Sequence, residues 1–325
     1  MLLLWLNYSM VGDCMSYEDY DEYRKKIENF FVSDLDKFEN KLMKKILFII
    51  TKQTDLEQTI TNAALFCDKT HTHIKFINAA HYYSSKLKEL NYHILGLQDI
   101  IDAIEKSPIE NSEVAIIKEN SSKDPFSSIM EIVDSSQISL IIVQHPFSDI
   151  LKEEMSNGQL GKTIEQLVSH ALTSSKIPLL ILKNNNLIEE GYNHVVMAGT
   201  DWINDYAFNT LIQLSNTLEA KLTLIPFIKE TIYKESEIAN KILEVTKEVE
   251  KFINEANEWL NRHKLVVTIK KGTVSKNKSE FLSQLQELHP DVVALYVPRK
   301  TEVVDSFIDV VRKAETNVII VPDLH

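Results

Sequence analysis

Hydrophobic positions in this chain fall into short apolar runs separated by longer stretches with helical spacing. Ile46–Ile50 is one such run. Continuous runs of this kind are typical of strands buried on both faces of a parallel sheet. Leu56–Lys69, which follows, has the apolar spacing of a helix. Strands and helices alternate in this way to the end of the chain, which predicts parallel sheets joined by right-handed crossovers.

The alternating pattern occurs twice. The first series opens at Lys45–Ile50 and closes at Leu179–Leu182, and the second opens at His194–Ala198 and closes at Asn317–Val321. Each series predicts five strands with a helix between each pair. We therefore expect an α/β fold with two doubly wound, mainly five-stranded parallel sheets in tandem, which amounts to a pseudo-dimer within the chain.

These series define the expected domains. The first domain covers 44–183 and the second covers 194–325, with a linker at 184–193 that contains a run of Asn and Gly191. Residues 1–43 form an N-terminal helical extension, because apolar residues recur from Tyr20 to Leu42 at three- and four-residue steps. Packing of this stripe on the first domain is favoured over the alternative, a dimerisation or docking helix.

The two series differ in the connection between their last two strands. In the first, a long segment separates Leu140–Val143 from Leu179–Leu182, and it contains Gly158, Gly161, Lys162 and Thr163. In the second, little more than one helix separates Val292–Tyr296 from Val318–Val321. In folds of this class a phosphate would sit on that connection, so the shorter second connection bears directly on function.

Ser156–Thr163 (SNGQLGKT) nearly spells a phosphate-binding loop. A serine stands where the first glycine belongs, and a dozen residues intervene after Val143, although such a loop should follow its strand at once. The weaker hypothesis is that Gly161, Lys162 and Thr163 hold a phosphate at a helix N-terminus. An ordinary glycine turn capped by Thr163 is favoured over both.

Asp201 is the second candidate position. It follows the first strand of the second series, at the carboxyl edge where doubly wound sheets bind ligands. A helix cap is the favoured interpretation of Asp201, because the phosphate-holding connection is missing from that half of the chain.

Charge and composition exclude several classes of protein. The net charge of −12 among 325 residues argues against nonspecific nucleic-acid binding and against binding to anionic membrane surfaces. The two cysteines, Cys14 and Cys67, lack metal-ligand spacing and fit a reducing compartment. No apolar stretch reaches transmembrane length, so we expect a cytoplasmic protein without membrane insertion. Met15 and Met43 are alternative starts to Met1.

The sequence shows no catalytic constellation. Its histidines at 71, 73, 81, 93, 145 and 170 have no partner at metal-ligand spacing, so core or solvated roles are favoured over metal binding. There is no Gly-x-Ser-x-Gly motif. We therefore expect no enzyme and no metal site.

Six short segments carry a further signal, namely Val196–Asp201, Leu218–Leu224, Lys271–Thr273, His289–Leu295, Gln159–Glu165 and Ser175–Ile181. In order and spacing they resemble the universal stress protein family in a tandem form, over residues 44–183 and 194–323. The first segment is similar to the family's first strand with its Thr-Asp turn. The others are similar to its second-strand entry, glycine turn, fourth strand, turn into the last helix and last strand.

The resemblance implies strand order 3-2-1-4-5 and, in nucleotide-binding members, Gly-x-x-Gly, nine residues, then Gly-Ser/Thr after the fourth strand. This chain has Gln144–Phe147 there, with Lys162 after Gly161, and Val297–Thr301 in the second half. The favoured function is therefore a non-enzymatic stress-response or signalling protein that acts through protein partners or self-association. The alternatives are an ATP- or AMP-binding switch and a regulatory partner of a membrane transporter that docks through Tyr20–Leu42.

Overall fold

The protein forms two compact units in a computed structural model. The structure describes residues 44–50, 56–66, 72–79, 96–116, 124–144, 166–171, 175–183, 192–199, 205–226, 235–262, 264–275, 278–297 and 316–322. The first unit takes its described residues from Lys41–Gly191 and Asn317–Ile320. The second unit takes most of its described residues from Tyr192–Thr316.

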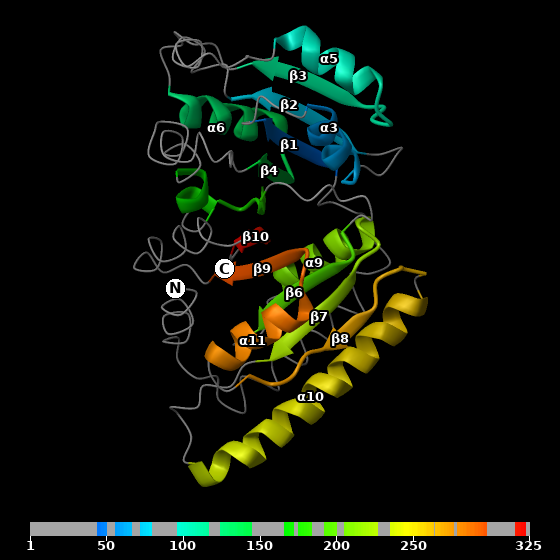
Figure 1. Cartoon of the computed structure of the whole chain (residues 1–325), viewed down its shortest axis with the longest axis vertical. Helices are drawn as coiled ribbons and strands as arrows, with labels where there is room; N and C mark the ends of the chain where they lie inside the picture. The colour runs from blue at the N-terminus through cyan, green and yellow to red at the C-terminus, as the bar shows by residue number, and fades with distance from the viewer. Residues whose placement is uncertain are drawn as a thin grey trace. The chain divides into compact units, whose positions relative to one another are not determined.

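The first unit is built on parallel strands in the order β3-β2-β1-β4-β5 (Figure 1). These strands are β1 (Lys45–Ile50), β2 (His73–Asn78), β3 (Ser112–Ile116), β4 (Leu140–Gln144) and β5 (Leu179–Leu182). The predicted α/β class and the strand order 3-2-1-4-5 are confirmed in this unit. The apolar run of β1 is central in this order, and all of Ile46–Ile50 is buried.

Helices alternate with these strands, as the pattern predicted. They are α3 (Leu56–Ala64), α5 (Leu97–Glu105), α6 (Pro125–Ser136) and a helical segment at 166–171. Asp124, directly before Pro125, predicts an N-cap by residue type. The structure confirms it, because the Asp124 carboxylate accepts a hydrogen bond from the Ser127 backbone N–H at 3.1 Å. These two hydrogen-bond partners fix where the chain enters α6.

The second unit has strands β6 (His194–Gly199), β7 (Lys221–Pro226), β8 (Ile269–Lys271) and β9 (Val292–Val297), all parallel, in the order β9-β6-β7-β8. This matches the first four places of the predicted order. Its helices are α9 (Asp205–Thr217), α10 (Glu235–Arg262) and α11 (Lys278–Leu288).

The long helix α10 runs beside β8 (Figure 1) and buries one stripe of its surface. The Phe252 ring lies 5.3 Å from the Phe208 ring of α9. The helical spacing of apolar residues from Ile238 to Leu260 predicts a core face, and most members of this stripe are buried, namely Val245, Val249, Ile253, Ala256 and Leu260. α10 is therefore held to the unit by its apolar face.

A side chain of α10 also closes the outer edge of β8. The Asn257 side-chain nitrogen donates to the Ile269 carbonyl at 2.8 Å, and the Asn257 side-chain oxygen accepts from the Ile269 N–H at 2.8 Å. One amide thus pairs with both backbone groups of an edge-strand residue, in place of a neighbouring strand.

The apolar spacing of Leu265–Ile269 predicts a strand over these residues, and this prediction is largely wrong, since β8 begins only at Ile269. The Val266 N–H donates to the Asn216 side chain at 3.1 Å, so this stretch is held by a side chain of α9 and not by a strand. The apolar run predicted a strand, but pairing with β7 starts where Ile269 faces Leu222.

The last strand, β10 (Asn317–Pro322), pairs antiparallel with β5, with Ile319 opposite Leu180. All other strand pairs described by residue register are parallel. β5 therefore has a neighbour on each side, β4 and β10. The sequence predicted that β10 is a strand but did not predict its pairing with β5. The pattern of apolar side chains indicates that a strand is buried and does not indicate which strand lies beside it.

No helix among the described residues is long and apolar enough to cross a membrane.

Four helix ends place non-glycine residues in the left-handed region. Gln137 (φ 53°), Glu219 (φ 53°), Lys264 (φ 58°) and His289 (φ 42°) follow α6, α9, α10 and α11. At the end of α10 the Leu265 N–H donates to the Leu260 carbonyl at 3.0 Å, so the turn is fixed by the backbone. A side chain in this conformation costs about 1–2 kcal/mol.

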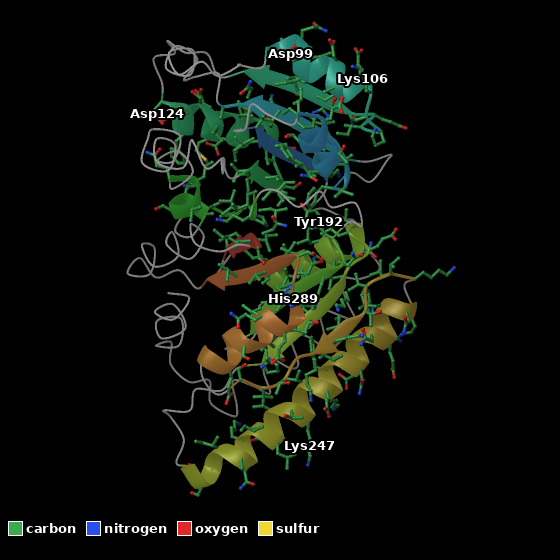
Figure 2. The ribbon with its side chains drawn as sticks, in the orientation of Figure 1. Asp99, Lys106, Asp124, Tyr192, Lys247 and His289 are labelled. Atoms are coloured by element: carbon green, nitrogen blue, oxygen red, sulfur yellow. The ribbon has the colours of Figure 1, made fainter. Side chains whose placement is uncertain are left out.

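Replacing Lys264 with glycine should therefore raise the free energy of unfolding by about 0.5–1 kcal/mol, since glycine loses the steric cost but gains freedom in the unfolded chain. Urea denaturation followed by circular dichroism measures the change. The matched control is Lys247→Gly in the middle of α10 (Figure 2), which should lower stability by about 1 kcal/mol. Destabilisation by both changes would contradict the assigned helix end.

Candidate functional site

The carboxyl ends of the first unit's strands lie level with one another. The register pairs Ile50 with Asn78, Asn78 with Ile116, and Gln144 with Leu182. In open parallel sheets, ligands bind beyond this edge where the strand order reverses. Here the order reverses between β1 and β4, so the candidate site lies beyond Ile50 and Gln144.

A buried polar residue marks this edge. Asn78 is the last residue of β2 and is fully buried. One residue further, the Ala79 N–H donates to the Ile50 carbonyl at 3.0 Å. Backbone pairing of β1 and β2 thus continues to the carboxyl end of both strands, so the two strands end at the same level.

The predicted phosphate-binding residues, Gly158, Gly161, Lys162 and Thr163, lie outside the described residues, as does Asp201. The structure describes the two flanks of the glycine-containing segment. β4 ends at Gln144, and the chain is helical again at 166–171. β4 ends next to the switch point, and a phosphate site on the segment that follows it remains a prediction. Asp201 comes two residues after β6 ends at Gly199.

Sequence reasoning missed two polar residues at the end of β5. The Lys183 N–H donates to the Asn317 side-chain oxygen at 2.7 Å, which ties the end of β5 to the start of β10. Burial lowers the pKa of the Lys183 amine to about 7, so this amine is fully charged only below neutral pH. The signal was a single lysine directly after the apolar run Leu179–Leu182.

In the second unit the carboxyl edge of β8 continues as a bulge. The Gly272 N–H donates to the Leu224 carbonyl at 2.7 Å, and the Ser275 N–H donates to the Pro226 carbonyl at 2.9 Å. The two residue steps from Leu224 to Pro226 are thus matched by three residue steps from Gly272 to Ser275, which is the geometry of a bulge. A Cβ on Gly272 would lie 2.8 Å from Ile225, so glycine is needed for this close approach.

A glutamine of α11 holds this bulge in place. The Gln284 side chain accepts from the Thr273 N–H at 2.9 Å and donates to the Thr273 carbonyl and the Ser275 hydroxyl, each at 2.8 Å. The glycine turn at Lys271–Thr273 therefore has a structural partner in the chain itself, which the sequence did not indicate.

The structure describes two of the histidines that the sequence weighed as ligands. His73 lies 3.6 Å from the Glu113 carboxylate and hydrogen-bonds Asn111 at 2.8 Å. The His170 ring makes an edge-to-face contact with the Phe126 ring, and burial lowers the pKa of His170. The histidines at 71, 81, 93 and 145 lie outside the described residues. Among described residues no group of three or more His, Cys, Asp or Glu could hold a metal ion.

A third histidine, which the sequence analysis did not weigh, heads the first strand of the second unit. His194 is 4% exposed, and its ring nitrogens contact the Thr223 hydroxyl at 2.8 Å and the Leu288 carbonyl at 3.1 Å. Burial lowers the pKa of His194, with a smaller contribution from Lys221. Nearby, burial raises the pKa of the Tyr192 phenol, and Asp291 adds to this effect.

Both units cap the amino end of their first strand in the same way. In the second unit the Asp291 carboxylate accepts from the Asn193 and His194 N–H groups at 2.8 and 2.9 Å. In the first unit the Ser139 hydroxyl accepts from the Lys45 N–H at 3.0 Å. Asp291 and Ser139 each directly precede the fourth strand of their series. We call the contacts of His194 with Asp291 and Thr223 the amino-edge clasp. This clasp lies at the amino ends of the strands, and the candidate ligand site lies at their carboxyl ends.

Comparison with solved structures places the fold. The chain is similar to a universal stress protein from Archaeoglobus fulgidus DSM 4304, at 14% identity and a TM-score of 0.55, covering 87% of this chain and 98% of that one. This likeness shows that the chain has a universal-stress-type α/β fold. Neither the protein-family models nor the curated proteins gave a match.

Acid should weaken the amino-edge clasp. Because the folded pKa of His194 is lowered, the unfolded chain binds its proton more readily, so stability falls as pH drops from about 6.5 through the folded pKa. The variant His194→Gln should lose that part of the pH dependence, measured as melting temperature against pH. Thr223→Val is the control, since it removes a hydrogen bond but keeps the imidazole. Equal pH slopes in wild type and His194→Gln would contradict this role.

Proposed function

We propose that the chain is a tandem universal-stress-type protein that acts in stress response or signalling through protein contacts, without catalysis of its own. The likeness to the Archaeoglobus protein supports the fold on which this proposal rests. The role, the partners and the cytoplasmic location come from the sequence and are part of the proposal.

The observation that carries the proposal is the difference between the two strand 4 to strand 5 connections. In the first half the connection covers 145–178, between β4 and β5, and in the second it covers 298–316, between β9 and β10. Strand bounds support the shortening that the sequence indicated. A phosphate held beyond the fourth strand needs free backbone N–H groups from this connection, and the second half has less chain to supply them.

The residues that follow the two fourth strands support the same proposal. Gln144 is followed by His-Pro-Phe, and Val297 is followed by Pro-Arg-Lys-Thr. Neither turn has a glycine, although a backbone that wraps a phosphate depends on residues that adopt positive φ. A protein that keeps this fold without that loop retains its surfaces, which favours function through contacts.

The tandem form rests on two matching features. Both units have strands 3-2-1-4 in the same order, and both clasp the first strand with the residue before the fourth. A duplicated unit accounts for both features. The second unit would then have diverged at its carboxyl edge and kept its amino edge.

A second candidate function is an ATP- or AMP-binding switch confined to the first unit. The observation in its favour is the level carboxyl edge beside the switch point, from which the segment containing Gly158, Gly161, Lys162 and Thr163 departs. The nucleotide phosphates would lie at the start of the helix that includes 166–171.

The proposed lack of catalysis predicts no ATP hydrolysis above background by the purified protein. Phosphate release should be the same for wild type and Lys162→Ala, since no group of the chain is proposed to act on the γ-phosphate. Turnover well above background that Lys162→Ala abolishes would overturn the proposal.

The leading proposal also predicts no change in melting temperature with ATP, AMP or their magnesium complexes at millimolar concentration. Under the alternative, a ligand at about 100 times its Kd would stabilise the native state by about 2.7 kcal/mol. Gly161→Val should abolish such a shift, whereas Asp201→Ala should not.

Gly96→Ser is the matched control for the glycine substitution. Gly96 has φ −76°, which any residue adopts, and it is the N-cap of α5. A thermal shift that survives in Gly96→Ser and disappears in Gly161→Val would establish the switch and replace the leading proposal.

A further inference from the structure

β3 is the outermost strand of the first unit. It stands at the end of the strand order, and β2 is its only strand neighbour in the described part of the chain (Figure 1). No residue at 112–115 is fully buried, whereas all of Leu179–Leu182 in the inner strand β5 is buried. Among the described residues, one side of β3 therefore lacks a neighbouring strand.

The pairing with β2 shows which backbone groups of β3 point outward. Ile74 faces Ser112 in the register, and the Ile74 N–H donates to the Asn111 carbonyl at 3.0 Å. In a parallel pair, alternate residues of one strand bond to the same neighbour, so the odd-numbered residues from Asn111 onward bond to β2. The N–H and C=O groups of Ser112 and Val114 therefore point away from β2.

The outermost strand of the second unit differs in this respect. There the Asn257 side chain bonds both backbone groups of Ile269. From the described residues, no such side-chain bond reaches the outward groups of Ser112 or Val114. An edge of this kind accepts one more strand, because its unpaired N–H and C=O groups can bond an extended chain.

The surface beside this edge is acidic. α5, the turn after it and β3 together carry one exposed lysine, Lys106, and five exposed carboxylates (Figure 2). The carboxylates are those of Asp99, Asp102, Glu105, Glu110 and Glu113. α5 packs on β3, so this charge lies close to the edge. The Lys75 amine contacts the Glu113 carboxylate at 2.7 Å and offsets one of the five charges, which leaves a net negative surface.

This charge decides between two occupants of the edge. A second copy of β3 would bring the same acidic surface next to the first, and like charges across an interface suppress such pairing. An extended segment that carries lysine or arginine meets opposite charge along the same edge. The charge therefore favours a basic segment of another protein over self-association through β3.

We propose that β3 is an open strand edge that binds an extended, basic segment of a partner protein, which adds to the first unit's sheet as a further strand. Backbone hydrogen bonds to Ser112 and Val114 attach the segment, and the acidic surface of α5 selects its positive charge. The proposal rests on the proposed function, action through protein contacts, and names the class of partner.

A labelled peptide of about seven residues, alternating lysine and valine, is the probe. It is titrated with the full chain at about 50 mM salt and followed by fluorescence anisotropy, because higher salt screens surface charge. The lysine peptide should bind about tenfold tighter than a peptide in which glutamate replaces every lysine. Equal affinity of the two peptides would overturn the proposal.

Val114→Pro tests the strand edge itself. Proline removes one outward N–H and leaves the pairing with β2 in place, since it is tolerated on edge strands where the N–H faces solvent. Affinity for the lysine peptide should fall about tenfold. Val114→Thr is the matched control, because it keeps the N–H and the β-branched shape, and it should bind like the wild type. Equal affinity of the two variants would mean that charge alone holds the peptide and would contradict the proposal.

Hydrogen–deuterium exchange of the unsubstituted chain is a second measurement, independent of whether Val114→Pro folds. Saturating lysine peptide should slow exchange at 112–116 about tenfold and leave α10 unchanged. Protection elsewhere, or none, would overturn the assignment of β3 while the absence of ATP turnover still supported the proposed function. ATP turnover that Lys162→Ala abolishes would instead count against the proposed function.

Discussion

Parallel pairing at matched register is the constraint on which the rest of this structure depends. Because β1 pairs in step with β2 and with β4, the strands of the first unit end on one line, and the chain must leave and return at that line. This fixes where a ligand would approach and which connection would meet it, so under the proposed function a shorter connection would alter what a whole unit can bind. The same pairing puts the opposite ends of the strands together, where Ser139 and Asp291 act as clasps.

Much of the fold follows from local sequence. The continuous apolar runs predicted β1, β5 and β9 with bounds close to those observed, because these strands are buried on both faces. Asp124 before Pro125 predicted the start of α6, since both residues act within one helical turn. These features depend only on the residues within each segment.

The remainder depends on partners distant in sequence. The apolar run after α10, Leu265–Ile269, predicted a strand. However, the Asn216 side chain bonds the backbone at Val266, and pairing with β7 begins only at Ile269. The antiparallel partner of β5, the clasp at His194 and the glutamine behind the Gly272 turn all join residues far apart along the chain. The predicted phosphate segment and Asp201 remain predictions, because they fall outside the described residues.

The amide of Asn257 has a consequence for assembly into fibres. An exposed edge strand is the usual template on which further chains add to a sheet and build insoluble aggregates. At Ile269 both backbone groups are already occupied by a side chain of α10, so an incoming strand must first break these two hydrogen bonds. A single asparagine thus blocks strand addition at this residue of the outermost strand.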